Sequence, residues 1–200
     1  MYSQPFHNSI TMEEYPQACN LANYIGSEIK PNIVYDFGCS MGLYVREIKK
    51  VLPNIPVHGF EFAQDAINNA LCENIHLQDL TLPITLTKKN KTLGICLEVL
   101  EHIDDLQSHA VLENITRNTD ILIFSAALPG QGGTGHINCR PRIDWIRRFA
   151  DLGWVIDLDS TQHLLNHMVK GSYMGWFIAN AMVLVPSSTK QPVYFFNNYL

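Results

Sequence analysis

Four acidic residues recur through the first half of the chain, each at the end of a short apolar run. They are Asp36, Glu61, Asp79 and Glu98. If each run is a strand of a parallel sheet, the acids share its carboxyl edge, where open parallel sheets bind ligands. An ionised carboxylate only accepts hydrogen bonds, and one carboxylate can take both hydroxyls of a vicinal diol. Four carboxylates in one place are unfavourable unless a ligand needs them, so the pattern predicts a binding site.

A glycine-containing turn follows the first of these acids. The stretch Ile33-Val-Tyr-Asp36-Phe-Gly38-Cys39-Ser40-Met41-Gly42 reads as a strand, a tight turn and the start of a helix. This geometry lets a ligand lie against bare backbone at a helix N-terminus. The dinucleotide pattern G-x-G-x-x-G does not fit, because Ser40 and Leu43 stand where its second and third glycines belong. The pattern present is D-x-G-x-x-x-G.

This turn and the four acids resemble the class I methyltransferases, which bind S-adenosylmethionine. The resemblance covers residues 33 to about 185 and implies that Glu61 accepts hydrogen bonds from both ribose hydroxyls. It also implies that Asp79 takes the adenine amine, that the backbone N–H of Leu80 meets a ring nitrogen, and that Asp36 orients the ammonium or the turn. The residues expected to bind the cofactor are Asp36, Gly38, Cys39, Ser40, Gly42, Glu61, Phe62, Asp79, Leu80 and Glu98.

The two glycines of the turn, Gly38 and Gly42, allow close approach of the backbone to the methionine portion of the cofactor. Ser40 stands where many members of the family have glycine, which the turn tolerates if the φ of Ser40 is negative. Each acid taken alone is also consistent with a solvated strand end or a helix cap. Four acids in order, one for each strand, favour the cofactor site.

The stretch Leu97-Glu98-Val99-Leu100-Glu101-His102-Ile103 resembles the E-V-L-E-H motif of small-molecule and quinone-type O-methyltransferases. Amino-methylating DNA enzymes carry an acid or asparagine followed by Pro-Pro and an aromatic residue at this place, and cytosine C5 enzymes carry a Pro-Cys nucleophile. The chain has neither motif, and Cys96 reads as a small buried apolar residue. Oxygen is therefore the favoured acceptor.

His136 lies in a glycine-rich loop, residues 128–140, that follows the fifth expected strand. A loop there faces the mouth of the pocket, and histidine is the usual base for a hydroxyl near neutral pH. Gly-His-x-Asn before Arg-Pro-x-x-x-Trp also resembles sugar and secondary-metabolite methyltransferases. We expect His136 to be catalytic, with a surface or helix-capping histidine as the alternative, and Glu101 and His102 are next in line as the base.

A second pair of histidines has the spacing of metal ligands. His163 and His167 are four residues apart on an expected helix. No third ligand is evident nearby in the sequence, so solvated or capping histidines are the better interpretation. No metal is expected.

The elements that must position these residues alternate between strand and helix. Strands are expected at 33–37, 56–62, 74–78, 92–97, 120–126, 154–158 and 180–185, and helices at 12–29, 41–52, 63–72, 104–116, 141–152 and 161–169. Such alternation indicates a parallel α/β sheet. The resemblance adds an antiparallel last strand. The expected fold is a Rossmann-like seven-stranded, mostly parallel sheet with helices on both faces.

Apolar spacing predicts the buried face of each helix. The first helix, with Pro16 in its first turn, should bury Ala18, Leu21, Ala22 and Ile25. The residues expected inward from the helices at 104–116 and 141–152 are Leu106, Ala110, Ile115, Ile143, Ile146 and Phe149. The chain is expected to form one domain over residues 1–200, with a helical lid or edge segment (1–32), a cofactor-binding half (33–127) and a substrate-side half (128–200).

Composition narrows the class of protein. With 46% hydrophobic residues, 16% charged residues and a net charge of −5, the chain is an ordinary globular protein without the basic face that usually binds nucleic acid. Its five scattered cysteines indicate a reducing compartment. No signal peptide is evident, and no uncharged apolar run reaches the ~20 residues of a membrane span. A cytoplasmic protein is expected.

The predicted function is transfer of a methyl group from S-adenosylmethionine to a nucleophile, favoured as oxygen, on a small molecule or sugar. One alternative is an RNA methyltransferase that uses a local basic patch. The arginines of that patch are Arg140, Arg142, Arg147 and Arg148. The other alternative is a non-catalytic cofactor-binding module. The sequence leaves the acceptor and the oligomeric state open.

Overall fold

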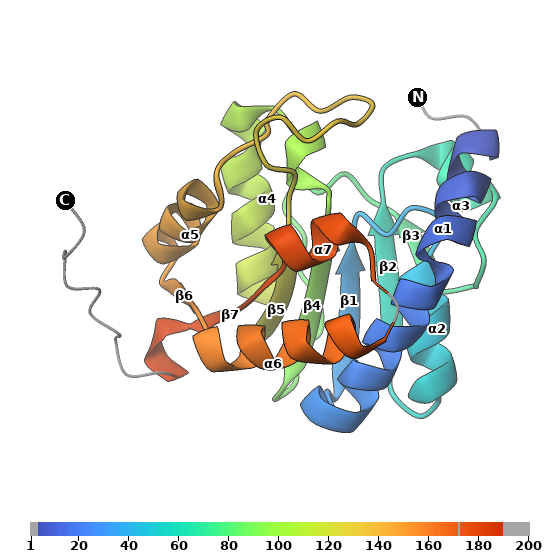
Figure 1. Ribbon diagram of the computed structural model, residues 1–200, viewed down its shortest axis with the longest axis horizontal. Coiled ribbons are helices and arrows are strands. Elements are labelled where there is room, and N and C mark those ends of the chain that lie inside the picture. Colours follow the sequence, from blue (N-terminus) through green and yellow to red (C-terminus); the bar gives the residue numbers. More distant parts are fainter. Residues whose placement is uncertain (1–3, 172, 190–200) are drawn as a thin grey trace.

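The computed structural model describes residues 4–171 and 173–189 of the chain (Figure 1). Its centre is a seven-stranded sheet with the strand order β3-β2-β1-β4-β5-β7-β6. The strands are β1 (Ile33–Phe37), β2 (Val57–Glu61), β3 (Ile75–Leu77), β4 (Thr92–Leu97), β5 (Ile121–Ser125), β6 (Trp154–Ile156) and β7 (Met182–Pro186). Strands β1 to β5 pair in parallel, whereas β7 runs antiparallel to both β5 and β6. The expected fold class is confirmed.

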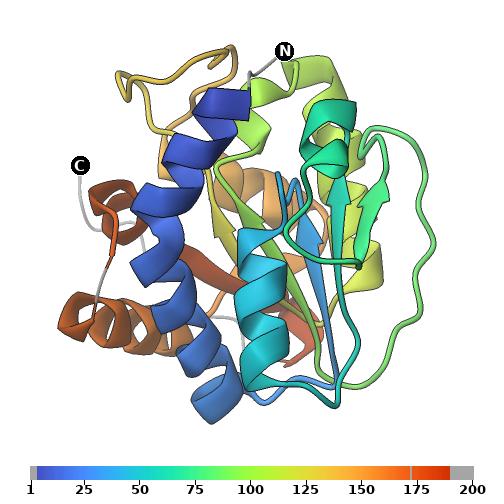
Figure 2. The same ribbon diagram turned by 90° about the vertical axis from the view of Figure 1, so that its right-hand side faces the viewer.

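Helices cover both faces of this sheet (Figures 1 and 2). One face carries α1 (Gln4–Tyr24), α2 (Leu43–Val51), α6 (Leu158–Lys170) and α7 (Gly175–Asn180), and the other carries α4 (Asp105–Asn118) and α5 (Arg142–Asp151). Successive side chains of a strand point to opposite faces. Val34 accordingly packs in the layer of α1 and α2, while Ile33 and Tyr35 pack in the layer of α4 and α5.

The order of the strands creates a switch point beside β1. The chain runs outward from β1 to β2 and β3, and then crosses back to β4 on the other side of β1. In open α/β sheets, ligands bind outside the carboxyl ends of the strands at such a point. Asp36 lies in β1, and Glu98 directly follows β4. Two of the four acids therefore flank the switch point.

The N-terminal helix begins earlier than expected. It starts at Gln4 rather than Met12, so Pro16 lies in its interior. Pro5 instead takes the first-turn position that proline favours. The expected buried residues are confirmed, because Ala18, Leu21, Ala22 and Ile25 are fully buried. The α-helix ends at Tyr24, and a single π-helical turn (Ile25–Ile29) leads toward β1.

In each of two later helices one residue that was expected inward faces the solvent, while the expected Ile115 and Phe149 are fully buried. Leu106 is 92% exposed and Ile143 is 50% exposed, so both predictions were wrong. With 100° of rotation per residue, position 106 lies opposite positions 108, 111, 112 and 115, and position 143 lies opposite 145 and 149. The side chains that α4 and α5 bury are Ser108, Val111, Leu112, Ile115, Trp145 and Phe149.

Several other boundaries differ from the expectation. Helix α3 (Gln64–Asn68) is shorter than predicted, and α7 was not predicted. Helix α6 begins at Leu158 because the side chain of Asp157 caps it, accepting a hydrogen bond from the N–H of Ser160. None of the helices in the described part of the chain has both the length and the apolar character needed to cross a membrane.

Candidate functional site

Asp36 is a buried acid at the carboxyl end of β1. It is 4% exposed, and its Oδ2 has no hydrogen-bond partner among the described residues. Burial raises the pKa of this carboxyl to about 8, and the charges of Glu61 and Glu14 act in the same direction. A buried polar atom without a partner is costly. The position is therefore suited to a ligand that brings a hydrogen-bond donor with positive charge.

This raised pKa predicts the effect of Asp36→Asn on stability. The folded-state pKa of about 8 exceeds the unfolded value of ~3.9, so the folded protein holds this proton more tightly than the unfolded chain does. The protonated carboxyl therefore adds to the free energy of unfolding. This contribution is complete below pH ~4 and is lost as the pH rises through about 8. Asparagine stays neutral throughout. In thermal unfolding of the ligand-free proteins at pH ~8.5, the variant should melt at least ~2–4 °C above the wild type, the shift expected for ~1 kcal/mol.

The exposed Asp65 supplies a matched control for this measurement. Asp65→Asn should leave the pH dependence of the melting temperature unchanged, because the side chain is solvated in both states. If Asp36→Asn and the wild type show the same pH dependence, the burial of Asp36 does not control stability.

Glu61, at the end of β2, faces the glycine turn. Its Oε2 accepts a hydrogen bond from the backbone N–H of Ser40 at 2.9 Å, and its Oε1 accepts one from the backbone N–H of Ala63 at 2.8 Å. A carboxylate offers about four lone-pair sites, so both oxygens retain acceptor capacity. The side chain thus fixes the turn and can still accept hydrogen bonds from a ligand.

The glycines of the turn are required by the chain itself. Gly38 and Gly42 have φ values of 79° and 81°, which glycine adopts without strain. A Cβ at Gly38 would overlap the methyl groups of Val99, and a Cβ at Gly42 would overlap Ile75. The sequence suggested contact with a ligand as the reason for these glycines. In the structure, backbone conformation and packing already require glycine at both positions, whether or not a ligand is bound.

Ser40 departs from the expected conformation. Its φ is +50°, whereas the sequence interpretation required a negative value. A non-glycine residue in this region carries a strain of order 1–3 kcal/mol. The hydrogen bond from its N–H to Glu61 helps to hold this conformation.

The acid after β3 lies beside the end of β2, because the N–H of Gln78 donates to the carbonyl of Glu61 at 2.8 Å. Asp79 Oδ1 accepts hydrogen bonds from the N–H and the hydroxyl of Thr81 at 2.9 and 2.7 Å. Leu80 is buried, while Phe62 is 71% exposed. The structure therefore brings Asp79 and Leu80 to the same edge of the sheet as Glu61.

Glu98 is engaged by two amides that the sequence did not single out. Gln131 Nε2 donates to Oε2 of Glu98 at 2.6 Å, and Asn180 Nδ2 donates to Oε1 at 3.2 Å. Asn180 also donates to Oε1 of Gln131 at 2.9 Å. Because Gln131 lies in the glycine-rich loop and Asn180 in α7, the carboxylate of Glu98 links three separate segments.

A fifth acid, Glu14, reaches this region from α1. Burial raises its pKa to about 7, a hydrogen bond with Tyr44 opposes the rise, and the charge of Glu98 adds to it. Gln17, one turn later, donates to the hydroxyl of Tyr44 at 2.7 Å and accepts from the N–H of Met174 at 2.6 Å. The sequence carried no motif that marked Glu14. Helix α1 lies over one face of the sheet (Figure 2), and its opening as a lid stays a prediction.

His136 lies beside the E-V-L-E-H motif. Its ring packs edge-on against the ring of His102, with 4.9 Å between the centroids. One ligand-type atom from each of Glu101, His102 and His136 lies within 4.8 Å of the others. Nδ1 of His136 is 3.3 Å from the carbonyl oxygen of Gln131, and Nδ1 of His102 is 3.2 Å from that of Gly135.

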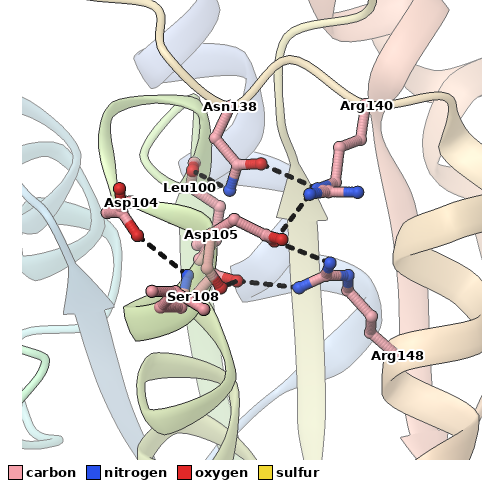
Figure 3. A network of polar contacts seen from close by, with 8 residues as sticks. Leu100, Asp104, Asp105, Ser108, Asn138, Arg140 and Arg148 are labelled. Carbon is pink, nitrogen blue, oxygen red and sulfur yellow. Dashed lines mark hydrogen bonds and ion pairs between the residues drawn. The ribbon is translucent and has the colours of Figure 1, made fainter.

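The loop that carries His136 is fastened directly after this residue (Figure 3). The backbone N–H of Asn138 donates to the carbonyl of Glu101 at 3.0 Å. The side chain of Asn138 donates to the carbonyl of Leu100 at 3.3 Å and accepts from Arg140 at 2.7 Å. Arg140 in turn pairs with Asp105 at 2.6 Å. These contacts hold His136 against the motif.

The same network engages two of the four arginines of the basic patch considered for RNA, Arg140 and Arg148 (Figure 3). Arg140 and Arg148 share the carboxylate of Asp105, each at 2.6 Å. Arg147 lies 3.6 Å from Asp144. The fourth, Arg142, donates to a backbone carbonyl at 3.0 Å. Each of the four arginines therefore has a polar partner within the protein, and Arg147 is the most exposed of the three that form ion pairs, with 73% of its side chain accessible.

The other histidine pair lies away from the acids. His163 and His167 flank the ring of Tyr24, at 5.7 and 5.2 Å between centroids. His163 also lines a cavity of about 260 Å³ with residues that precede β1 and β4, at the amino edge of the parallel strands. Within residues 4–171 and 173–189, the group of Glu101, His102 and His136 is the only set of three or more potential metal ligands.

Protein-family models and curated proteins give no match to the sequence. Solved structures do match. The sugar N-methyltransferase KedS8 from Streptoalloteichus sp ATCC 53650 superposes with a TM-score of 0.67 over 92% of this chain and 93% of that chain, at 11% sequence identity. The chain has the class I methyltransferase fold.

Two other structures with this methyltransferase fold extend the comparison. The magnesium protoporphyrin IX methyltransferase ChlM from Synechocystis PCC 6803, with bound S-adenosylmethionine, gives a TM-score of 0.59 at 16% identity over 92% of this chain and 84% of that chain. The mitomycin 7-O-methyltransferase MmcR gives 0.63 at 11% identity over 90% of this chain and 56% of that chain. At such identities the likeness is one of fold, so the chemistry has to be argued from the side chains of this chain.

Proposed function

We propose that this protein transfers a methyl group from S-adenosylmethionine to an oxygen of a small molecule or sugar. The observation that carries the proposal is Asp36, a buried carboxylate with an unpartnered oxygen at the switch point of the sheet. Glu61 lies across the glycine turn from it. An ammonium and a ribose diol, presented side by side, match these two acids. The bound S-adenosylmethionine in ChlM, a protein of the same fold, supports the assignment.

Each remaining acid has a part in this proposal. Asp36 binds the ammonium, and Glu61 accepts hydrogen bonds from both ribose hydroxyls. Asp79 uses Oδ2 for the adenine amine, because Oδ1 already accepts two hydrogen bonds from Thr81. The N–H of Leu80 meets the adenine ring, and Glu98 holds the loop and α7 around the pocket. The turn from Gly38 to Gly42, including Cys39 and Ser40, lies against the methionine portion, and Phe62 lies beside the ribose.

The cofactor supplies an activated methyl group, so the protein mainly has to position the acceptor, exclude water and assist loss of a hydroxyl proton. His136 is the residue that we propose for the last task. Its contact with the carbonyl of Gln131 favours the tautomer with the proton on Nδ1, which leaves the lone pair on Nε2.

The paired arginines disfavour the RNA alternative, because an RNA surface needs available cationic groups. All five cysteines are free. Free cysteines support a reducing compartment, which for this chain we propose to be the cytoplasm.

A transfer experiment tests the proposal. The protein is incubated with radiolabelled S-adenosylmethionine and fractionated small-molecule extracts, and label in an ether-linked methyl group is the expected result. Calorimetry with S-adenosylhomocysteine runs in parallel. Cofactor binding without transfer to any fraction would favour the non-catalytic module, and absence of binding would refute the cofactor assignment itself.

A further inference from the structure

Glu101 is the most deeply buried acid near the glycine-rich loop that carries His136. Its side chain is fully buried, and within the described residues neither carboxylate oxygen makes a hydrogen bond of regular geometry. Such a carboxylate is unstable as an anion unless a positive partner is present.

The two neighbouring histidines are arranged as metal ligands usually are. Nδ1 of His102 and Nδ1 of His136 each lie at hydrogen-bonding distance from a backbone carbonyl. Histidines that bind a metal commonly donate one ring N–H to a carbonyl or carboxylate, which orients the ring and leaves the other nitrogen as the ligand. Gly133 keeps room beside His136, since a Cβ there would overlap Nε2.

We propose that Glu101, His102 and His136 bind a divalent transition-metal cation such as Mn²⁺ or Zn²⁺. Two imidazoles and one carboxylate suit first-row transition ions better than Mg²⁺ or Ca²⁺, which prefer oxygen ligands. Ligand atoms around such an ion lie about 3–4 Å apart when the bonds are about 2.0–2.2 Å. The three ligand atoms here lie within 4.8 Å of one another, so small side-chain rotations bring them onto one ion.

The rigidity of the loop supports this site. The N–H groups of Ile137 and Asn138 both donate to the carbonyl of Glu101, at 2.8 and 3.0 Å. The backbone that follows His136 is thus tied to the residue that supplies the carboxylate ligand. A site held in this way needs little ordering when a cation binds, which favours affinity.

The role of the cation rests on the proposed function. A divalent cation lowers the pKa of a hydroxyl that it contacts. The acceptor's proton then passes to water, the oxygen forms a bond to the methyl carbon, and the bond from that carbon to sulfur breaks, giving a methyl ether and S-adenosylhomocysteine. With the cation bound, the lone pair of His136 is taken up by the metal, so the cation replaces His136 as the group that activates the hydroxyl, and no separate base is needed.

Metal titration of the full chain tests the site without any assay of activity. The protein is freed of metal with EDTA and titrated with MnCl₂, with free Mn²⁺ followed by electron paramagnetic resonance, and with ZnCl₂ and MgCl₂ by calorimetry. We expect about one equivalent of Mn²⁺ or Zn²⁺ to bind more tightly than Mg²⁺. Glu101→Gln and His102→Gln should each weaken binding by at least about tenfold, because loss of an outer-shell partner alone costs 10–100-fold.

His109→Ala is the matched control, since it removes a surface histidine of α4 and should bind metal as the wild type does. S-Adenosylhomocysteine affinity, measured on the same proteins, reports whether each variant is folded and tests the proposed function separately. If Glu101→Gln does not fold, the metal affinity of His102→Gln tests the site, because His102 is only half-buried and its replacement disturbs the core less. Failure of the wild type to bind Mn²⁺ or Zn²⁺, or unchanged affinity in the folded ligand variants, would overturn the proposal.

Discussion

Replacing His136 with alanine is expected to lower the turnover number by ~10²–10⁴-fold, the usual contribution of a positioned catalytic base. The affinity for S-adenosylhomocysteine should stay nearly unchanged, because Asp36 lies in β1, Glu61 ends β2 and the glycine turn joins β1 to α2, so all three lie outside the loop. Single-turnover rates at saturating cofactor give the first quantity, and calorimetry gives the second. The loop itself should persist, since Asn138 and Arg140 hold it independently of the imidazole.

The neighbouring Ile137→Ala is the control, because this side chain is 67% exposed and its backbone contact with Glu101 survives the change. If His136→Ala turns over normally, another group assists the hydroxyl, with Glu101 and His102 next. If cofactor affinity collapses with turnover, His136 shapes the pocket. EDTA separates the two chemical roles: it abolishes wild-type turnover if His136 is a ligand and leaves it intact if His136 is the base.

Glu61→Ala is expected to weaken binding of S-adenosylhomocysteine by more than tenfold. The loss of a charged acceptor that serves two hydroxyls corresponds to ~2–4 kcal/mol. The structure adds a second cause, because the N–H groups of Ser40 and Ala63 lose their shared acceptor and the turn loosens. Calorimetric titration measures the affinity, and the melting temperature without ligand measures the damage to the turn.

Glu61→Gln separates these two causes. Glutamine keeps the shape and one acceptor oxygen, but its NH₂ group faces a backbone donor that the carboxylate had satisfied. Its affinity should lie between those of the wild type and Glu61→Ala. If Glu61→Ala is folded and binds as tightly as the wild type, Glu61 does not hold the ribose.

The order of strands and acids along the chain could be predicted because the central strands β1, β4 and β5 are buried and largely apolar, and an acid lies at or just after the end of each of the first four strands. The positions of Asp36, Glu61, Asp79 and Glu98 follow from that alternation. The contacts of Glu98 could not be predicted, since Gln131 and Asn180 are 33 and 82 residues away and ordinary in type. Local apolar spacing also gave a wrong prediction for Leu106, which was expected to be buried but lies on the exposed side of α4.

The backbone conformation of the turn could not be predicted from the sequence either. Its glycines predicted close approach of a ligand and not the positive φ values that Gly38, Ser40 and Gly42 adopt. Ser40 is held in this conformation by the hydrogen bond from its N–H to the carboxylate of Glu61, which the sequence does not show. The spacing of His163 and His167 along one helix is that of metal ligands. The side chains that lie within ligand distance of one another are instead those of Glu101, His102 and His136, from the turn after β4 and from a loop more than thirty residues later. Contacts of this kind depend on tertiary structure and leave no periodic trace in the sequence.

If Asp36 binds the ammonium as proposed, cofactor binding is expected to release protons. Asp36, with a pKa of about 8, and Glu14, with a pKa of about 7, carry protons for part of the time at neutral pH. An ammonium placed beside Asp36 favours the ionised carboxylate and expels its proton into the solvent. The heat of binding at pH ~7 then includes the heat with which the buffer takes up that proton. The apparent enthalpy in Tris and in phosphate should therefore differ, and the slope against buffer ionisation enthalpy counts the protons released.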